Sequence, residues 1–149
     1  MRALVLCLVA VSVALGVAGC GDFLEPTVGS AVAARCLNED TDTSQPVTYV
    51  KDIKPLFEMR CRNCHFPTGM NPIGIQSSRL DLSSFETIMA GGVSGPAVMA
   101  GMPCASPLYF KVAPGPPSGS RMPLNGPPFL SDTQIALIHD WILEGALEH

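Results

Sequence analysis

The residues best suited to chemistry in this chain form the run Cys61-Arg62-Asn63-Cys64-His65. Two cysteines separated by two residues and followed directly by histidine form the pattern by which c-type haem is attached covalently. The two thiols can form thioether bonds to the vinyl groups of one haem, and His65 then lies beside the porphyrin as an axial iron ligand. The composition of the chain gives about 0.005 such patterns by chance. We therefore expect Cys61, Cys64 and His65 to bind one haem c and its iron.

Three other interpretations of the Cys61–Cys64 pair compete with haem attachment. A thioredoxin-like redox pair needs a βαβ unit, which the sequence does not indicate. A zinc site needs four ligands, usually as two spaced pairs, and the chain offers one such pair. A structural disulfide between Cys61 and Cys64 is the third possibility. Haem attachment is favoured over all three.

An electron-carrying iron usually has a second axial ligand, and a methionine sulfur there raises the reduction potential. Met122 is the leading candidate, because it lies in a Gly/Pro-rich loop and Pro123 stiffens its backbone. Met102, which also precedes a proline, is the rival. His139 would give a bis-histidine site, but we expect it to be half-buried and solvated. Weaker candidates are Met59, Met70, Met89, Met99 and the last residue, His149.

The elements that must position these residues are predicted to be helices, since no segment alternates with the period of a strand. A first helix is expected from about Ile53, capped by Asp52, and leads into the cysteine motif. A second is expected to begin at Ser83, where Glu86 completes a capping box, and to stop at Gly91.

Two further helices follow in the second half of the chain. A short one is expected to begin with Ser106 as its cap and Pro107 at its first position. The strongest signals mark the last helix, where Ser131–Gln134 is a capping box, Leu130 and Ile135 occupy the staple positions, and Gly145 closes the apolar stripe. The prediction is a small all-α domain of about four helices, with a Gly/Pro-rich loop over residues 113–128.

The N-terminal residues indicate export. Residues 1–19 have a short positive start, an apolar run and a small-residue end, as in a secretory signal peptide. Residues 17–20 resemble a bacterial lipobox, which would make Cys20 the lipidated first residue of a protein anchored in the periplasm or at the cell surface. An uncleaved anchor helix and plain secretion are the alternatives. Residues 20–47 are expected to be the lipidated tether, and residues 48–149 the domain.

Composition limits the remaining choices. With 149 residues the chain has room for one domain, and its formal net charge of −4 argues against nucleic acid as a partner. Aromatic residues make up only 6%, so a large all-protein core is not expected, and a haem ring would supply the missing apolar volume. No Ser/His/Asp or paired-carboxylate arrangement stands out, so a hydrolase has no support. Two protein ligands would leave the iron no open site for catalysis on a small molecule, so we do not expect an enzyme.

From residue 48 to residue 147 the chain resembles class I monohaem c-type cytochromes, in particular the small domains of exported bacterial lipoproteins and planctomycete-type proteins. The segments that carry the resemblance are 49–57, 61–65, 80–85, 106–109, 121–123, 130–142 and 145–146. The resemblance implies a few helices around one covalent haem, Met122 as distal ligand, and single-electron transfer between redox partner proteins. The alternatives are a haem subunit of a larger oxidase or dehydrogenase, and a haem-based ligand sensor.

Two expectations concern residues around this framework. Cys36 and Cys104 are not part of the family pattern, and in an oxidising compartment without other free partners they are expected to form a disulfide that pins the tether to the domain. The second nitrogen of His65 is expected to bond a carbonyl near Pro67, which would fix its tautomer.

Overall fold

The computed structural model describes Cys36 and residues 44–149. The predicted signal peptide, Cys20 and most of the tether lie outside the described residues. Among those described, the regular structure is helical, with no strand beyond an isolated bridge between Gly92 and Gly95, so the all-α prediction is confirmed. None of the helices in this part of the chain is both long enough and apolar enough to cross a membrane.

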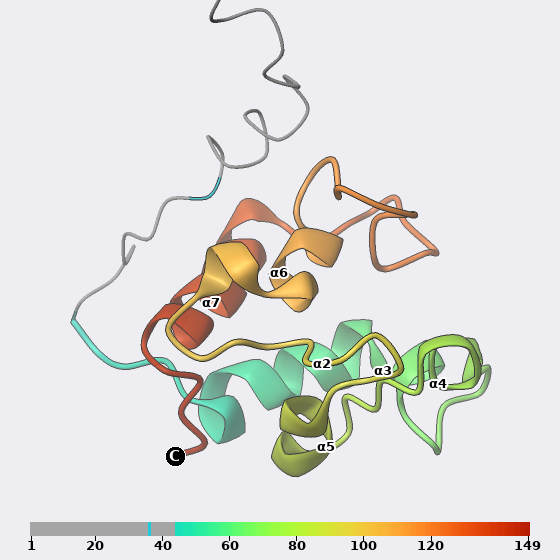
Figure 1. Ribbon diagram of the computed structural model, residues 1–149, viewed down its shortest axis with the longest axis horizontal. Helices are drawn as coiled ribbons and strands as arrows, with labels where there is room; N and C mark the ends of the chain where they lie inside the picture. Colours follow the sequence, from blue (N-terminus) through green and yellow to red (C-terminus); the bar gives the residue numbers. More distant parts are fainter. Residues whose placement is uncertain (1–35, 37–43) are drawn as a thin grey trace, which may run out of the picture.

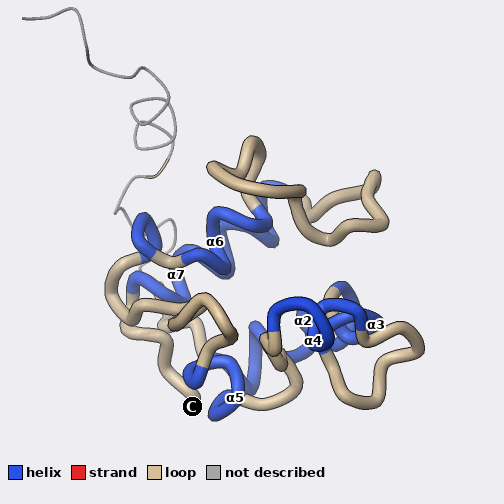
Figure 2. Tube along the Cα trace, turned by 45° about the vertical axis from the view of Figure 1, so that its right-hand side comes forward, coloured by secondary structure: helices blue, strands red, loops and turns tan. Residues whose placement is uncertain are grey.

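The helical segments are short and lie in two tiers (Figures 1 and 2). One tier contains α2 to α5, and the other contains α6, α7 and the loop that joins them. This loop, residues 113–131, has no helix of its own and runs out beyond α6 (Figure 1, orange). The segments are η1, a π-helical turn (Tyr49–Ile53), α2 (Lys54–Arg60), α3 (Arg62–His65), α4 (Ile73–Ser78), α5 (Phe85–Ala90), η2, a 3-10 turn (Pro103–Ala105), α6 (Pro107–Val112) and α7 (Asp132–Leu143).

Helix α7 begins and ends as predicted. The Ser131 hydroxyl accepts the Gln134 N–H (3.3 Å), and the Gln134 side chain accepts the Ser131 N–H (3.0 Å), which completes the capping box. Leu130 and Ile135, at the staple positions, are both buried. Gly145 follows the helix with φ of +104°, a conformation that glycine adopts without strain.

The first helix begins earlier than predicted. Helical structure begins at Tyr49, and Asp52 is not a cap for Ile53 but lies inside η1, where its carboxylate accepts the Thr48 N–H (2.9 Å). The Tyr49 N–H donates to the Leu147 carbonyl (2.8 Å). The C-terminal segment thus satisfies a backbone donor that would otherwise need a capping side chain.

The second predicted helix, α5, begins one residue later than expected. Its capping box is formed by Ser84 and Thr87, not by Ser83 and Glu86. The Ser83 N–H donates to the Asp81 carboxylate (2.8 Å), which holds Ser83 in the preceding turn. Asparagine and aspartate side chains commonly organise such turns, and here that turn moves the helix start by one position.

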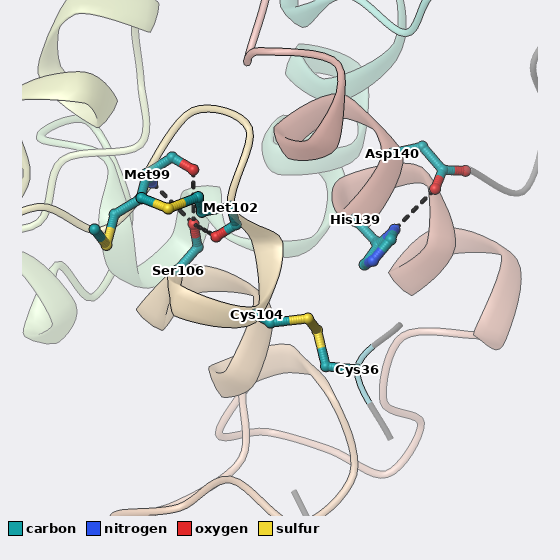
Figure 3. Close-up of a disulfide and its surroundings, with 7 residues drawn as sticks. All are labelled: Cys36, Met99, Met102, Cys104, Ser106, His139 and Asp140. Carbon is teal, nitrogen blue, oxygen red and sulfur yellow. Dashed lines mark hydrogen bonds and ion pairs between the residues drawn. A yellow bond between two sulfur atoms is a disulfide. The ribbon is translucent and has the colours of Figure 1, made fainter. Parts of the chain in front are cut away.

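Helix α6 has Pro107 at its first position as predicted, but Ser106 does not cap it with its side chain. The buried Ser106 hydroxyl instead donates to the Met102 carbonyl (2.9 Å) and accepts the Met99 N–H (2.8 Å), as Figure 3 shows. The hydroxyl therefore stabilises the turn that precedes η2 rather than the start of α6.

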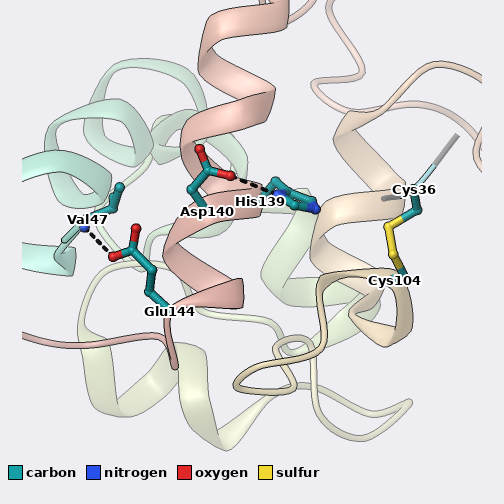
Figure 4. Close-up of polar contacts among 6 residues, drawn as sticks. All are labelled: Cys36, Val47, Cys104, His139, Asp140 and Glu144. Carbon is teal, nitrogen blue, oxygen red and sulfur yellow. Dashed lines mark hydrogen bonds and ion pairs between the residues drawn. A yellow bond between two sulfur atoms is a disulfide. The ribbon is translucent and has the colours of Figure 1, made fainter. Parts of the chain in front are cut away.

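The core is built mainly between α7 and the segments η1 and α2. Trp141 is fully buried, and its indole N–H donates to the Leu147 carbonyl (2.9 Å). The end of the predicted tether also packs here, because Val47 is buried and its N–H donates to the Glu144 carboxylate (2.6 Å; Figure 4). Other fully buried side chains of this core are Ile53, Phe57, Ile88, Ile138 and Ile142.

Candidate functional site

A cavity of about 390 Å³ contains the cysteine motif and the predicted distal methionine. Cys61, Cys64 and His65 line it from the first tier, and Met122 lines it from the loop after α6. The charged residues on its walls, Arg60 and Lys111, are both cationic. Most of the lining is apolar and comes from Ile73, Leu80, Leu82, Leu108, Val112 and Leu130.

The backbone of α2 and α3 places both thiols and the imidazole at this cavity. The Cys61 N–H donates to the Phe57 carbonyl (2.8 Å), so the helical path of α2 continues into the motif. The Cys61 carbonyl accepts the N–H groups of Cys64 (3.1 Å) and His65 (2.9 Å). Residues three and four apart in a helical turn share one face, which explains why these three side chains line the same space.

The environment of Cys61 does not suit a reactive thiolate. Burial raises the pKa of its thiol to about 12, and the nearby Arg60 offsets this only in part. Redox-active cysteines in Cys-x-x-Cys motifs have lowered pKa values instead. The structure also leaves Cys61 and Cys64 as two separate thiols.

The described residues offer no ready-made cage of protein ligands for a metal ion. Within residues 44–149 and Cys36, no three His, Cys, Asp or Glu side chains are grouped in the way that such a cage requires. Any metal at Cys61, Cys64 and His65 would therefore need a further partner, such as the ring of an organic cofactor.

His65 is oriented by a carbonyl that the sequence did not indicate. Its Nδ1 lies 3.0 Å from the Leu80 carbonyl oxygen, so the expectation of a carbonyl near Pro67 was wrong. A carbonyl can only accept, which places the proton on Nδ1 and leaves the Nε2 lone pair free for a metal. The segment that carries Leu80 is held beside His65 by a second hydrogen bond, from the Leu82 N–H to the His65 carbonyl (2.9 Å).

Helix α4, which was not predicted, packs its glycine against the His65 ring. A Cβ atom added at Gly74 would lie 2.6 Å from both Cε1 and Nε2 of His65. No side chain larger than hydrogen fits between this helix and the imidazole. The sequence signal for α4 is weak, since the structure shows no side-chain cap at its start and the helix contains glycine and two serines.

Met122 is held at the cavity by backbone contacts with α6. Its N–H donates to the Lys111 carbonyl (2.7 Å), and the Arg121 side chain donates to the Val112 carbonyl (2.8 Å). The Arg121 guanidinium also lies 4.5 Å from the centre of the Phe129 ring. Among the methionines that the structure describes, Met122 is the one that lines the cavity.

The rival methionines lie elsewhere. Met102 is 48% exposed and belongs to the turn held by Ser106 (Figure 3). Met59 and Met70 are largely exposed on the surface. Met89 packs against the core, and Met99 lies in the same turn as Met102.

His139 is buried, which corrects the expectation of a half-buried and solvated side chain. Its Nδ1 donates to the adjacent Asp140 carboxylate (2.9 Å; Figure 4), and the Tyr109 ring packs against it edge-on at 5.3 Å. It is not among the described residues that line the cavity, and His149 is exposed near the C-terminus. Of these three candidates for a second iron ligand, only Met122 is among the described residues that line the cavity.

Cys36 and Cys104 are joined in a disulfide (Figures 3 and 4). Cys104 belongs to η2, and Cys36 is buried. Neither cysteine lines the cavity. The bond therefore attaches a residue of the predicted tether to the α6–α7 tier, away from the cysteine motif.

No family model, curated protein or solved structure matches this chain.

Proposed function

We propose that this chain is a monohaem c-type cytochrome that transfers single electrons. The observation that carries the proposal is that Cys61, Cys64, His65 and Met122 all line one largely apolar cavity. A chance Cys-x-x-Cys-His run would have no reason to share an apolar cavity with a methionine from a distant loop.

The residues present fit a covalently bound haem. The two unpaired thiols would form the thioether bonds, and the free Nε2 of His65 would ligate the iron. The cavity volume lies within the range of about 300–1,000 Å³ that is usual for cofactor sites, and its apolar lining suits a porphyrin ring. When bound, the haem supplies an iron that alternates between Fe(III) and Fe(II).

Met122 supports electron transfer over chemistry on a small molecule. His65 and Met122 would both hold the iron, so protein side chains would supply both of the ligands that the haem ring does not. A thioether ligand also stabilises the reduced iron and raises the potential. This arrangement favours an electron carrier over a ligand sensor, in which one axial position must open.

The proposed setting is outside the cytoplasm. A signal peptide over residues 1–19 would direct export, and a lipid on Cys20 would anchor the domain to a membrane. The disulfide between Cys36 and Cys104 agrees with this setting, because disulfides persist in oxidising compartments. Its partner would be another redox protein that binds transiently. The proposed fold is correspondingly a small cytochrome c-like arrangement of helices around one haem.

The test is spectroscopic. The chain is expressed with haem-attachment machinery, and spectra are recorded for wild type, Met122→Ala and the control Met102→Ala. We expect the weak near-infrared sulfur–iron band in wild type and Met102→Ala, and its loss in Met122→Ala. Retention of the band in Met122→Ala would contradict the ligand assignment, and a wild type without haem absorption would contradict the function.

A further inference from the structure

The Arg60 side chain makes a hydrogen bond between the segment that carries the cysteine motif and the loop that carries Met122. The Arg60 guanidinium, directly before Cys61, donates to the Pro128 carbonyl (2.6 Å). Arg60 itself lines the cavity and is half-buried. The bond therefore bridges the two sides of the cavity near the place where the loop returns to α7.

The start of the same loop is held differently. Three hydrogen bonds tie it to α6: Met122 N–H to the Lys111 carbonyl, Arg121 to the Val112 carbonyl, and Lys111 to the Ser118 carbonyl (2.7–2.8 Å). All three lie within the α6–α7 tier. They would move with the loop, so they do not connect it to the cysteine motif. Beside the burial of Leu130, the hydrogen bond from Arg60 is a polar contact that does connect the two.

We infer that Arg60 is a positioning residue for Met122, because its bond to Pro128 holds the loop closed over the cavity. This inference rests on the proposed function. Attachment of Cys61 would fix the backbone beside Arg60, so its guanidinium would reach the carbonyl from a rigid base. With the loop closed, Met122 would stay at the cavity, where its sulfur would hold the iron, and external ligands would be kept out of the site.

The experiment uses the haem-loaded protein and compares wild type with Arg60→Met, Arg60→Lys and the control Arg62→Met. Methionine keeps an apolar stem but removes every donor, and lysine keeps one donor group. Arg62 is exposed, lies on the other side of Cys61, and loses the same charge in its variant. Two rates are measured, amide hydrogen exchange of residues 121–130 and carbon monoxide binding to the reduced protein, together with the reduction potential of each variant.

Loss of one charged hydrogen bond should speed both rates about tenfold in Arg60→Met. Arg62→Met should match wild type, and Arg60→Lys should lie between. Equal rates in Arg60→Met and Arg62→Met would overturn the inference, as would a shifted reduction potential without faster exchange, since Arg60 would then act only through its charge. A variant Arg60→Met that binds no haem would also count against it. The wild-type spectrum tests the proposed function separately.

Discussion

At the scale of single residues, protonation decides what Cys61 and His65 can do. The Leu80 carbonyl fixes the proton on Nδ1 of His65, so the other nitrogen is available for a metal. Burial raises the pKa of the Cys61 thiol and so keeps it neutral, which disfavours disulfide exchange. Both features agree with the proposed attachment of a cofactor and argue against thiol redox chemistry.

The raised pKa of Cys61 predicts a pH dependence in the chain without haem. Below pH 9 this thiol is neutral in both the folded and the unfolded chain. Between pH 9 and about 12 the unfolded thiol ionises while the folded one stays neutral, so the folded state loses stability as the pH rises. In Cys64→Ser, alkylation of Cys61 should remain slow until the pH approaches 12. Reaction with the pH profile of a free cysteine would contradict the burial of this thiol.

The residues that line the cavity were predictable from the sequence, whereas the carbonyl that orients His65 was not. Cys61, Cys64 and His65 are neighbours in the chain, so a helical turn is enough to bring them together. The Leu80 carbonyl is 15 residues from His65, and its position depends on the path of the intervening chain. No local pattern could have identified it.

At the scale of elements, side-chain caps were predictable where nothing competed with them. The capping box at Ser131 formed as expected, whereas Asp81 moved the start of α5 from Ser83 to Ser84. The first helix begins earlier because the C-terminal segment satisfies its Tyr49 N–H. Each difference arises from a partner that is invisible in the local window of sequence.

The substitution Gly74→Ala tests whether helix α4 packs against the His65 ring. Helix propensity alone would stabilise the protein by about 1 kcal/mol. The added Cβ would clash with the His65 ring, and overpacking costs about 1–3 kcal/mol. We expect a lower free energy of unfolding and a changed iron-ligand spectrum, both measured on haem-loaded protein. Gln76→Ala, at an exposed position of α4 that does not line the cavity, is the control. A Gly74→Ala protein more stable than wild type would contradict the packing.

At the scale of the whole molecule, two tiers enclose the cavity, and a disulfide ties the tether to one of them. The pairing of Cys36 with Cys104 was expected from compartment and from the lack of other partners. The arrangement of the helices in two tiers could not be predicted, because it depends on contacts between segments far apart in the chain. The bond spans 68 residues and does not line the cavity, so its removal should affect stability more than the haem site.

Reduction of this disulfide should lower the free energy of unfolding by about 2–4 kcal/mol, because closing a long loop restricts the unfolded chain. Thioether bonds resist the same reductant, so under the proposed function the haem should stay attached, and the Fe(II) spectrum should be the same with and without the disulfide. The measurement is denaturant unfolding with and without reductant, repeated on Cys36→Ser/Cys104→Ser, which should respond to reductant no further. Equal midpoints for reduced and oxidised wild type would show that the bond has no structural role.

The most direct test of the account is the mass of the mature protein, isolated from a host that attaches haem and treated with a thiol-alkylating reagent after denaturation. The account predicts a mass increased by one haem, with Cys61 and Cys64 both protected from the reagent. A colourless protein in which both cysteines are alkylated would contradict it.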